Sequence, residues 1–117
     1  MNKYKNKKIT YCGMEFDSVK EVRRYAELVA LEKAGIIHNL ECQVKFELIP
    51  AQKLSKPVRM LSGYVKRTER KVIYIADFVY VKEGQTIVED TKGYETEVFK
   101  IKRKLMLYRY GIQVVTL

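Results

Sequence analysis

The chain has 117 residues and carries 23 Lys and Arg against 14 Asp and Glu, a formal net charge of +9. This length suits one domain with a buried core and is too short for two. Hydrophobic residues make up 47% of the chain and charged residues 32%, a balance typical of globular proteins. No apolar run approaches the ~20 residues of a membrane span, and the first residues lack the apolar stretch of a signal peptide. One His and two widely spaced Cys exclude a His-rich or CxxC metal site. We therefore expect a soluble, cytoplasmic domain without a membrane partner and with an anionic partner.

Residues 9–16 are expected to form a short, β-like or irregular lead-in. A helix is predicted from about residue 17 to Gly35, with an apolar stripe of helical period that includes Val22, Tyr25 and Val29. Residues 41–49 alternate between apolar and polar side chains, which predicts a half-buried strand ended by Pro50. Residues 51–71 have no sustained period, and we expect a long loop or a loose hairpin there.

Residues 72–81 form the strongest predicted strand. Both of its faces are apolar, which is typical of a strand at the centre of a sheet. A turn at 82–85, a strand at 86–92, a helix at 96–110 and an apolar strand at 112–117 follow. The last strand–helix–strand unit should cross over right-handedly into a parallel pair. The order α-β-β-β-α-β predicts an α/β fold with a central mixed sheet flanked by helices.

Positive charge is concentrated in two segments. Residues 1–8 carry a net charge of +4 and residues 51–71 a net charge of +6, whereas the rest of the chain carries −1. A basic tail and a basic connector on a near-neutral body are typical of a protein that binds nucleic acid, and a solubilising surface is the alternative. The second helix adds three basic residues that either contact phosphate or form a solvated face. The candidate nucleic-acid-binding residues are Lys3, Lys5, Lys7, Lys8, Lys53, Lys56, Arg59, Lys66, Arg67, Arg70, Lys71, Lys100, Arg103 and Lys104.

Asp77 is the one charged residue in the strand at 72–81. A two-residue loop at 83–84 or a four-residue loop at 82–85 places Asp77 directly opposite Asp90, whereas a three- or five-residue loop shifts the register by one. Two facing aspartates repel each other, so a cation is expected between them, and Lys92 shares the strand face of Asp90. Carboxylate oxygens favour Mg²⁺ or Mn²⁺. A solvated acidic pair, or an ion pair with Lys92, is the alternative.

Glu21 is a third candidate acid, from the start of the first helix. Ser18 and Glu21 have the spacing of a capping box, so the Glu21 carboxylate either reaches back to cap its own helix or joins the metal site. Together, these residues could support metal-assisted hydrolysis of a phosphodiester, in which Lys92 positions the attacking water or neutralises developing charge. Gln43 lies on the polar side of its strand.

Three motifs in chain order resemble the PD-(D/E)xK nuclease superfamily: FDSVKE at 16–21, IADF at 75–78 and VEDTKG at 88–93. Over nearly its full length, the chain also resembles a family of small phage-encoded proteins, described as a domain of unknown function, with an EDxKG segment followed by a basic helix. Residue 76 is Ala where the superfamily has Pro.

The resemblance implies a restriction-endonuclease-like core, formed by a single nuclease-like domain over residues 1–117. It implies a Mg²⁺- or Mn²⁺-dependent endodeoxyribonuclease, with Glu21, Asp77, Asp90 and the carbonyl of Thr91 as metal ligands and Lys92 as the catalytic lysine. It further implies a phage or prophage protein in a bacterial host that acts, as a homodimer, on branched DNA such as a Holliday junction. A non-catalytic nucleic-acid-binding module and a protein-interaction domain are the alternative functions.

Overall fold

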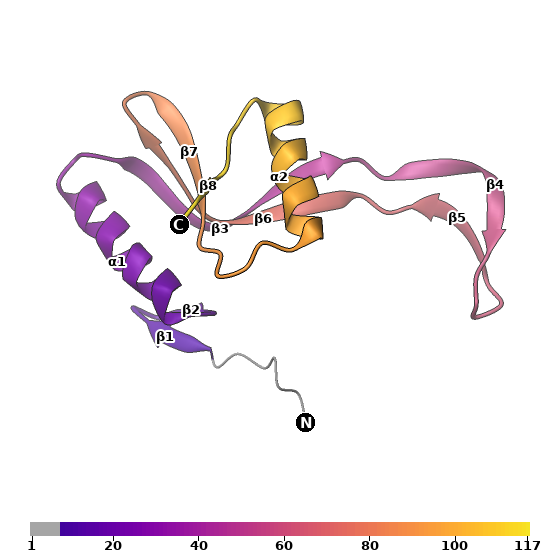
Figure 1. The fold of residues 1–117 in the computed structure, drawn as a ribbon, viewed down its shortest axis with the longest axis horizontal. Helices are drawn as coiled ribbons and strands as arrows, with labels where there is room; N and C mark the ends of the chain where they lie inside the picture. Colours follow the sequence, from indigo (N-terminus) through magenta and orange to yellow (C-terminus); the bar gives the residue numbers. More distant parts are fainter. Residues whose placement is uncertain (1–7) are drawn as a thin grey trace.

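The computed structural model describes residues 8–117 (Figure 1). Lys3, Lys5 and Lys7 therefore lie outside the described residues. Within them, the elements in chain order are β1 (Ile9–Tyr11), β2 (Met14–Phe16), α1 (Val19–Lys33), β3 (His38–Ile49), β4 (Gln52–Arg59), β5 (Val65–Glu69), β6 (Val72–Lys82), β7 (Gln85–Asp90), α2 (Glu97–Tyr110) and β8 (Val115–Thr116).

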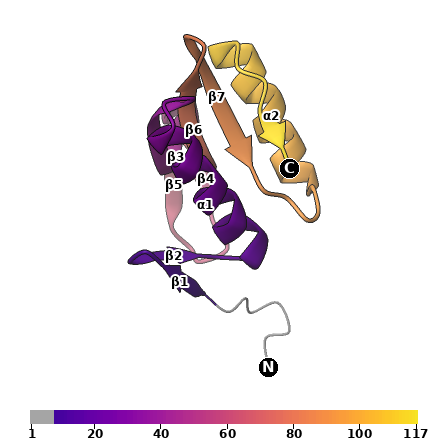
Figure 2. The ribbon, with the colours of Figure 1, turned by 90° about the vertical axis from the view of Figure 1, so that its left-hand side faces the viewer.

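The centre of the fold is a mixed sheet of four strands in the order β3-β6-β7-β8. The strands β3, β6 and β7 pair antiparallel, and β8 pairs parallel to β7 after the crossover through α2. The helices α1 and α2 lie on opposite sides of this sheet (Figure 2). The predicted α/β fold with a mixed central sheet is confirmed, and so is the central place of residues 72–81.

Both helices begin and end where their flanking residues favour it. The Ser18 hydroxyl accepts the N–H of Glu21 at 3.1 Å and so caps α1, and the Thr96 hydroxyl accepts the N–H of Phe99 at 3.1 Å and caps α2. Gly111 ends α2 with a φ of 67°, in the left-handed region that favours glycine. The predicted helix ends near residues 17, 96 and 111 therefore agree with the structure.

The core consists of two apolar clusters that divide β6 at Asp77. Tyr74 and Ala76 belong to the cluster packed against α2, whereas Phe78 and Tyr80 belong to the cluster packed against α1. In a regular strand, residues 76 and 78 would share one face. Ala76 and Phe78 pack against different helices, which indicates that the regular alternation of β6 is interrupted at Asp77. Asp77 therefore lies at the boundary between the two clusters.

Residues 52–69 pair as a hairpin, β4–β5, which decides between the two alternatives left open for this segment. The hairpin forms a sheet of its own and projects from the body beyond α2 (Figure 1). The molecule accordingly measures 55 × 41 × 24 Å, and its radius of gyration of 17.8 Å exceeds the roughly 13 Å of a compact chain of this length.

Two predicted strands are shorter than expected. β7 ends at Asp90 rather than at residue 92, so Lys92 lies in the connection to α2 and does not share a strand face with Asp90. β8 is confined to Val115–Thr116, within the predicted 112–117. Among the described residues, neither helix is long and apolar enough to cross a membrane.

Candidate active site

The turn between β6 and β7 sets the register of the acidic residues. Lys82 pairs with Gln85 across a two-residue loop in which Glu83 and Gly84 have φ values of 51° and 76°. Two successive positive φ values are typical of a type I′ hairpin turn. The predicted register is confirmed from this turn to Phe78 opposite Glu89, the last pair before Asp77 and Asp90. The two aspartates follow directly after that pair, and Asp77 accepts hydrogen bonds from Thr91, the residue after Asp90.

Asp77 is fixed by the first residue after β7. Its Oδ2 accepts hydrogen bonds from the backbone N–H and the side-chain hydroxyl of Thr91, both at 2.8 Å. Its Oδ1 has a single, long contact of 3.4 Å from the Gln43 amide. One carboxylate oxygen therefore orients the side chain, while the other is left accessible to a further partner.

Gln43 links the helix acid to the strand acid. Its Nε2 donates to Glu21 Oε1 at 3.2 Å and lies 3.4 Å from Asp77 Oδ1. The β3–β6 register places Gln43 opposite Asp77, between the pairs Cys42–Phe78 and Val44–Ala76. The φ of Gln43 is 54°, a strained backbone conformation for a side chain of this type. The sequence shows Gln43 only as a polar strand residue, because its place beside Glu21 and Asp77 depends on the pairing of β3 with β6.

The carboxylate of Glu21 lies within the acidic cluster. Ser18 provides the helix cap, and the side chain of Glu21 is 3% exposed and contacts Gln43. Burial, and next the charge of Asp77, raise the pKa of Glu21 to about 7. Its only hydrogen bond to another side chain among residues 8–117 is to an amide, so no described cation balances its charge.

Asp90 is the most enclosed acid of the cluster, with 1% exposure. The Tyr74 hydroxyl donates to its Oδ2 at 2.6 Å, whereas its Oδ1 has no hydrogen-bond partner among residues 8–117. Burial, and next the contact with Asp77, raise its pKa to about 6, although Tyr74 and Lys92 oppose the shift. A buried oxygen that lacks a donor and a carboxylate that resists ionisation both favour a cation at this position.

Lys92 reaches the cluster from the loop after β7. Its Nζ lies 3.4 Å from Asp90 Oδ1, beyond ideal hydrogen-bond length, and 4.8 Å from the centroid of the Phe99 ring. The ring face attracts the ammonium group and holds it beside the acids. Lys92 is therefore placed at the edge of the site by Asp90 and by α2 together.

Glu89 is next to Asp90 in sequence but belongs to a different environment. Arg24 Nε and Nη2 donate to its two carboxylate oxygens at 2.8 and 2.7 Å, and the Tyr80 hydroxyl donates to it as well. Glu89 is 1% exposed, and these hydrogen bonds raise the pKa of Arg24. Its charge is thus fully paired within the protein, so it is unavailable to a metal ion.

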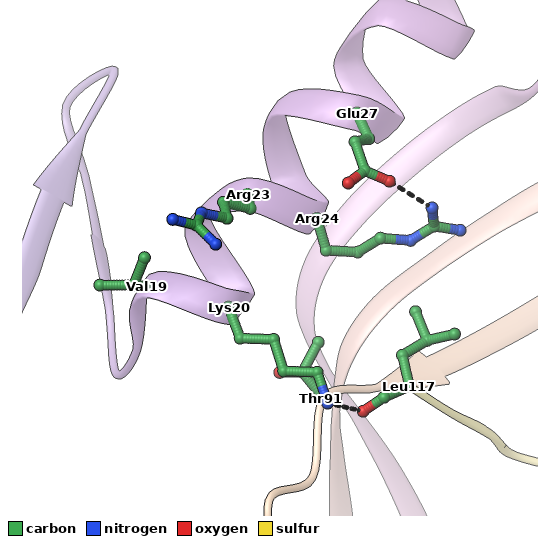
Figure 3. Close-up of a pocket in the computed structure, with 7 residues that line it drawn as sticks. All are labelled: Val19, Lys20, Arg23, Arg24, Glu27, Thr91 and Leu117. Carbon is green, nitrogen blue, oxygen red and sulfur yellow. Dashed lines mark hydrogen bonds and ion pairs between the residues drawn. The ribbon is translucent and has the colours of Figure 1, made fainter.

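The acidic cluster opens into a cavity of about 370 Å³. Asp17, Ser18, Lys20, Glu21, Asp77, Thr91, Lys92 and Gly93 line it. Lys20 and Thr91 also line an adjoining cavity of about 410 Å³, where Lys20 donates to the carbonyl of Leu117 and Arg24 pairs with Glu27 (Figure 3). Arg23 lines this second cavity as well and forms no ion pair within residues 8–117. An acidic site and a basic recess therefore adjoin each other.

The residues of the cluster suit a hard divalent cation. No group of three or more His, Cys, Asp or Glu side chains within residues 8–117 forms a ready-made metal cage. Mg²⁺, however, is usually held by one or two carboxylates, with waters and substrate phosphate completing its shell. Asp77 Oδ1 and Asp90 Oδ1 both lack a strong hydrogen bond, and the raised pKa of Asp90 couples ion binding to proton release. The donor set therefore fits Mg²⁺ or Mn²⁺.

Most of the candidate nucleic-acid-binding residues lie outside the acidic cluster. Six are exposed on or beside the hairpin: Lys53, Lys56, Arg59, Arg67, Arg70 and Lys71. Four others form ion pairs: Lys8 with Asp17, Lys66 with Glu69, Lys100 with Glu97 and Arg103 with Glu95. Lys104 is exposed on α2. The hairpin therefore presents the densest group of basic side chains that have no acidic partner among the described residues.

A family model described as a protein of unknown function (DUF1064) matches residues 1–116. No curated protein and no solved structure matches the chain.

Proposed function

The chain belongs to the DUF1064 family of proteins of unknown function, and we propose that it is a metal-dependent endodeoxyribonuclease that hydrolyses DNA phosphodiester bonds. The observation that carries the proposal is the buried acidic cluster of Glu21, Asp77 and Asp90, whose charge no described cation fully balances, with Lys92 at its edge. Structural acids in a core are normally paired, as Glu89 is with Arg24. An unbalanced cluster that opens to solvent is instead typical of a site that binds a cation.

Each residue of the cluster has a role that follows from its contacts. Asp77 and Asp90 would hold Mg²⁺ or Mn²⁺, which supplies Lewis-acid polarisation of the phosphodiester and activation of water. Glu21 is placed by Gln43 to accept a proton from the attacking water or to bind through an intervening water. Lys92, held by Asp90 and Phe99, stabilises the negative charge that develops on the phosphate. Thr91 orients Asp77 through its N–H and hydroxyl, and the proposed ligation by its carbonyl stays a prediction.

The charge distribution supports DNA as the substrate. The cavity beside the acidic cluster offers Lys20 and Arg23, which suit another phosphate of the same DNA backbone. The hairpin, with its exposed lysines and arginines, suits a more distant part of the same backbone. Outside residues 1–8 and 51–71 the net charge is −1, so DNA binding would depend on local groups of basic side chains rather than on the overall charge of the body.

The proposal is tested by incubating the purified chain with supercoiled plasmid and with labelled duplex, flap and four-way-junction DNA, each in Mg²⁺, Mn²⁺ or EDTA. We expect cleavage with either metal ion and none in EDTA. The variants Asp77→Asn, Asp90→Asn and Lys92→Ala should each lower the cleavage rate by about 10²-fold or more, since each removes a group that acts on the reacting phosphate. Cleavage that persists in EDTA or in all three variants would exclude this site.

Matched controls separate the chemistry from folding and from charge. Glu97→Gln removes an exposed acid on α2, and Lys82→Ala removes an exposed lysine in the β6–β7 turn. Both controls should cleave at the rate of the unmodified chain. The three site variants should still bind DNA when Ca²⁺ replaces Mg²⁺. Salt-dependent DNA binding without cleavage by any form of the chain would instead support a non-catalytic binding module.

Two finer predictions stay part of the proposal. The resemblance to the PD-(D/E)xK superfamily and to small phage-encoded proteins implies a preference for branched DNA and a homodimer. The comparison of DNA shapes in the same assay tests the first, and sedimentation velocity with and without DNA tests the second. Equal rates on all shapes, or a monomer at every concentration, would contradict them while leaving the hydrolytic site in place.

A further inference from the structure

The hairpin β4–β5 is an arm with a basic stem and an apolar tip. Its tip is a three-residue loop in which the Met60 N–H donates to the Tyr64 carbonyl at 2.7 Å and the Gly63 N–H donates to the Met60 carbonyl at 2.9 Å. Gly63 has a φ of 88°, as the last loop residue of such a hairpin requires. The tip therefore has a defined turn, which holds its side chains in fixed directions.

Large apolar side chains gather at this tip and are exposed. Leu61 is fully exposed and Tyr64 is 74% exposed, and Val58, Met60 and Val65 are each about half exposed. Val58, Met60 and Tyr64 share one face of the hairpin, because Val58 pairs with Lys66 and side chains alternate along each strand. An apolar patch at the end of a projecting arm is not needed for the core, and so indicates a surface that contacts a partner.

Positive charge beside the patch identifies the kind of partner. Residues 51–71 carry seven basic side chains and one acidic side chain, Glu69, which pairs with Lys66. A two-stranded ribbon fits the major groove of DNA, and the eight residues of β4 extend roughly 26 Å. Charge repulsion and Pro57, which cannot donate a backbone hydrogen bond, disfavour pairing of the β4 edge with a second copy of the chain.

We propose that this hairpin grips the DNA backbone through its stem and inserts Leu61 and Tyr64 against bases that are unpaired or unstacked, as at a branch point. The inference rests on the proposed function in taking DNA as the partner, and it adds the element that selects the DNA shape. An exposed base offers its face to an aromatic side chain, whereas a base in regular duplex is already stacked. Insertion into duplex must also overcome the unstacking of a base step. The tip therefore favours branched DNA, while the stem binds any DNA.

The test compares binding of the full chain to a four-way junction and to a linear duplex of the same sequence, in EDTA so that no cleavage is required. The tip variant Leu61→Ser/Tyr64→Ser should lose about tenfold or more in affinity for the junction and less than about twofold for the duplex. The stem variant Lys56→Ala/Arg59→Ala should weaken both and lower the slope of log affinity against log salt by about two. Tyr64→Phe should bind the junction as tightly as the unmodified chain, since it keeps the aromatic ring. Ser62→Ala is the matched control at the tip and should also leave junction binding unchanged.

Three results would overturn the inference. The tip variant could bind both DNA shapes with the affinity of the unmodified chain, or it could lose the same affinity for both. It could also change the sedimentation coefficient of the chain without DNA, which would assign the tip to self-association. Cleavage is measured separately, so the two proposals fail in different ways. If no form of the chain cleaves DNA but the tip variant loses its preference for the junction, the nuclease proposal is refuted and the proposal for the hairpin stands. If the chain cleaves DNA but the tip variant binds both DNA shapes like the unmodified chain, the nuclease proposal stands and the proposal for the hairpin is refuted.

Discussion

The ion pair between Arg24 and Glu89 gives the sharpest test of how the two adjacent acids at the end of β7 differ. Replacing Arg24 with Leu removes both hydrogen bonds at 2.8 and 2.7 Å and leaves Glu89, which is 1% exposed, without its cation. Removing one partner of a buried ion pair costs about 3–5 kcal/mol, because the remaining charge stays desolvated. A chain of this length has a total stability of roughly 6–18 kcal/mol, so this one change should remove a large part of it.

The assay is urea unfolding at neutral pH, followed by circular dichroism, for the unmodified chain and four variants. Arg24→Leu should lower the free energy of unfolding by about 3–5 kcal/mol, and Arg24→Lys by less, since it keeps the charge but not the paired geometry. Arg23→Leu, one residue away on the exposed side of α1, is the control and should change it by less than about 0.5 kcal/mol. The double variant Arg24→Leu/Glu89→Leu should recover much of the loss, because no buried charge remains.

The reasoning would be refuted by a loss below about 1 kcal/mol for Arg24→Leu, or by a double variant less stable than the single variant. The first result would mean that Glu89 finds another partner or reaches water. The second would mean that packing around Glu89, rather than its charge, holds β7 against α1.

Three further predictions concern the acidic cluster. Without divalent metal, the free energy of unfolding should fall as pH rises from about 4 to about 7. The pKa of Asp90 is raised to about 6 and that of Glu21 to about 7 in the folded chain. Over this pH range the folded chain therefore keeps protons that the unfolded chain has released, which lowers the stability of the folded chain as pH rises. Comparison with Asp90→Asn isolates the share of Asp90, and equal pH slopes for the two proteins would contradict it. Tyr74→Phe removes the donor to Asp90 Oδ2 and should lower the free energy of unfolding by roughly 1–3 kcal/mol at pH 7.5, measured against Tyr108→Phe, an exposed tyrosine on α2. Gln43→Asn should change the free energy of unfolding by less than about 1 kcal/mol, since Asn tolerates a positive φ. It should nevertheless slow cleavage, because the shorter amide no longer spans Glu21 and Asp77. A fall in stability with unchanged cleavage would contradict this role.

Features set by local chemistry were predictable from the sequence. The β6–β7 register follows from a two-residue turn at Glu83 and Gly84, so the pairing as far as Phe78 and Glu89, next to Asp77 and Asp90, needed no structure. The helix starts follow from Ser18 and Thr96, whose hydroxyls cap the helices. These signals lie within a few residues of the features they determine.

Features that depend on distant residues were not predictable in the same way. The pairing of Glu89 with Arg24 joins residues 65 positions apart, and the change of helix contacts at Asp77 depends on how both helices pack on the sheet. Gln43 was visible as a polar strand residue, but its positive φ and its two acidic neighbours arise only when β3, β6 and α1 meet. The functions of the site and of the hairpin stay predictions.

The pairing of β3 with β6 shifts register between Glu47 and Ile49, and the separate β4–β5 hairpin shifts register between Lys53 and Val58. Each shift is a place where one strand holds extra residues without disturbing the pairs beyond it. An insertion or deletion in the hairpin can therefore be absorbed before it reaches the pairing of β3 and β6 around Gln43. A change in the length of the arm can therefore leave the geometry of the acidic cluster intact, so the proposed selection of DNA shape and the proposed hydrolysis depend on separate parts of the fold.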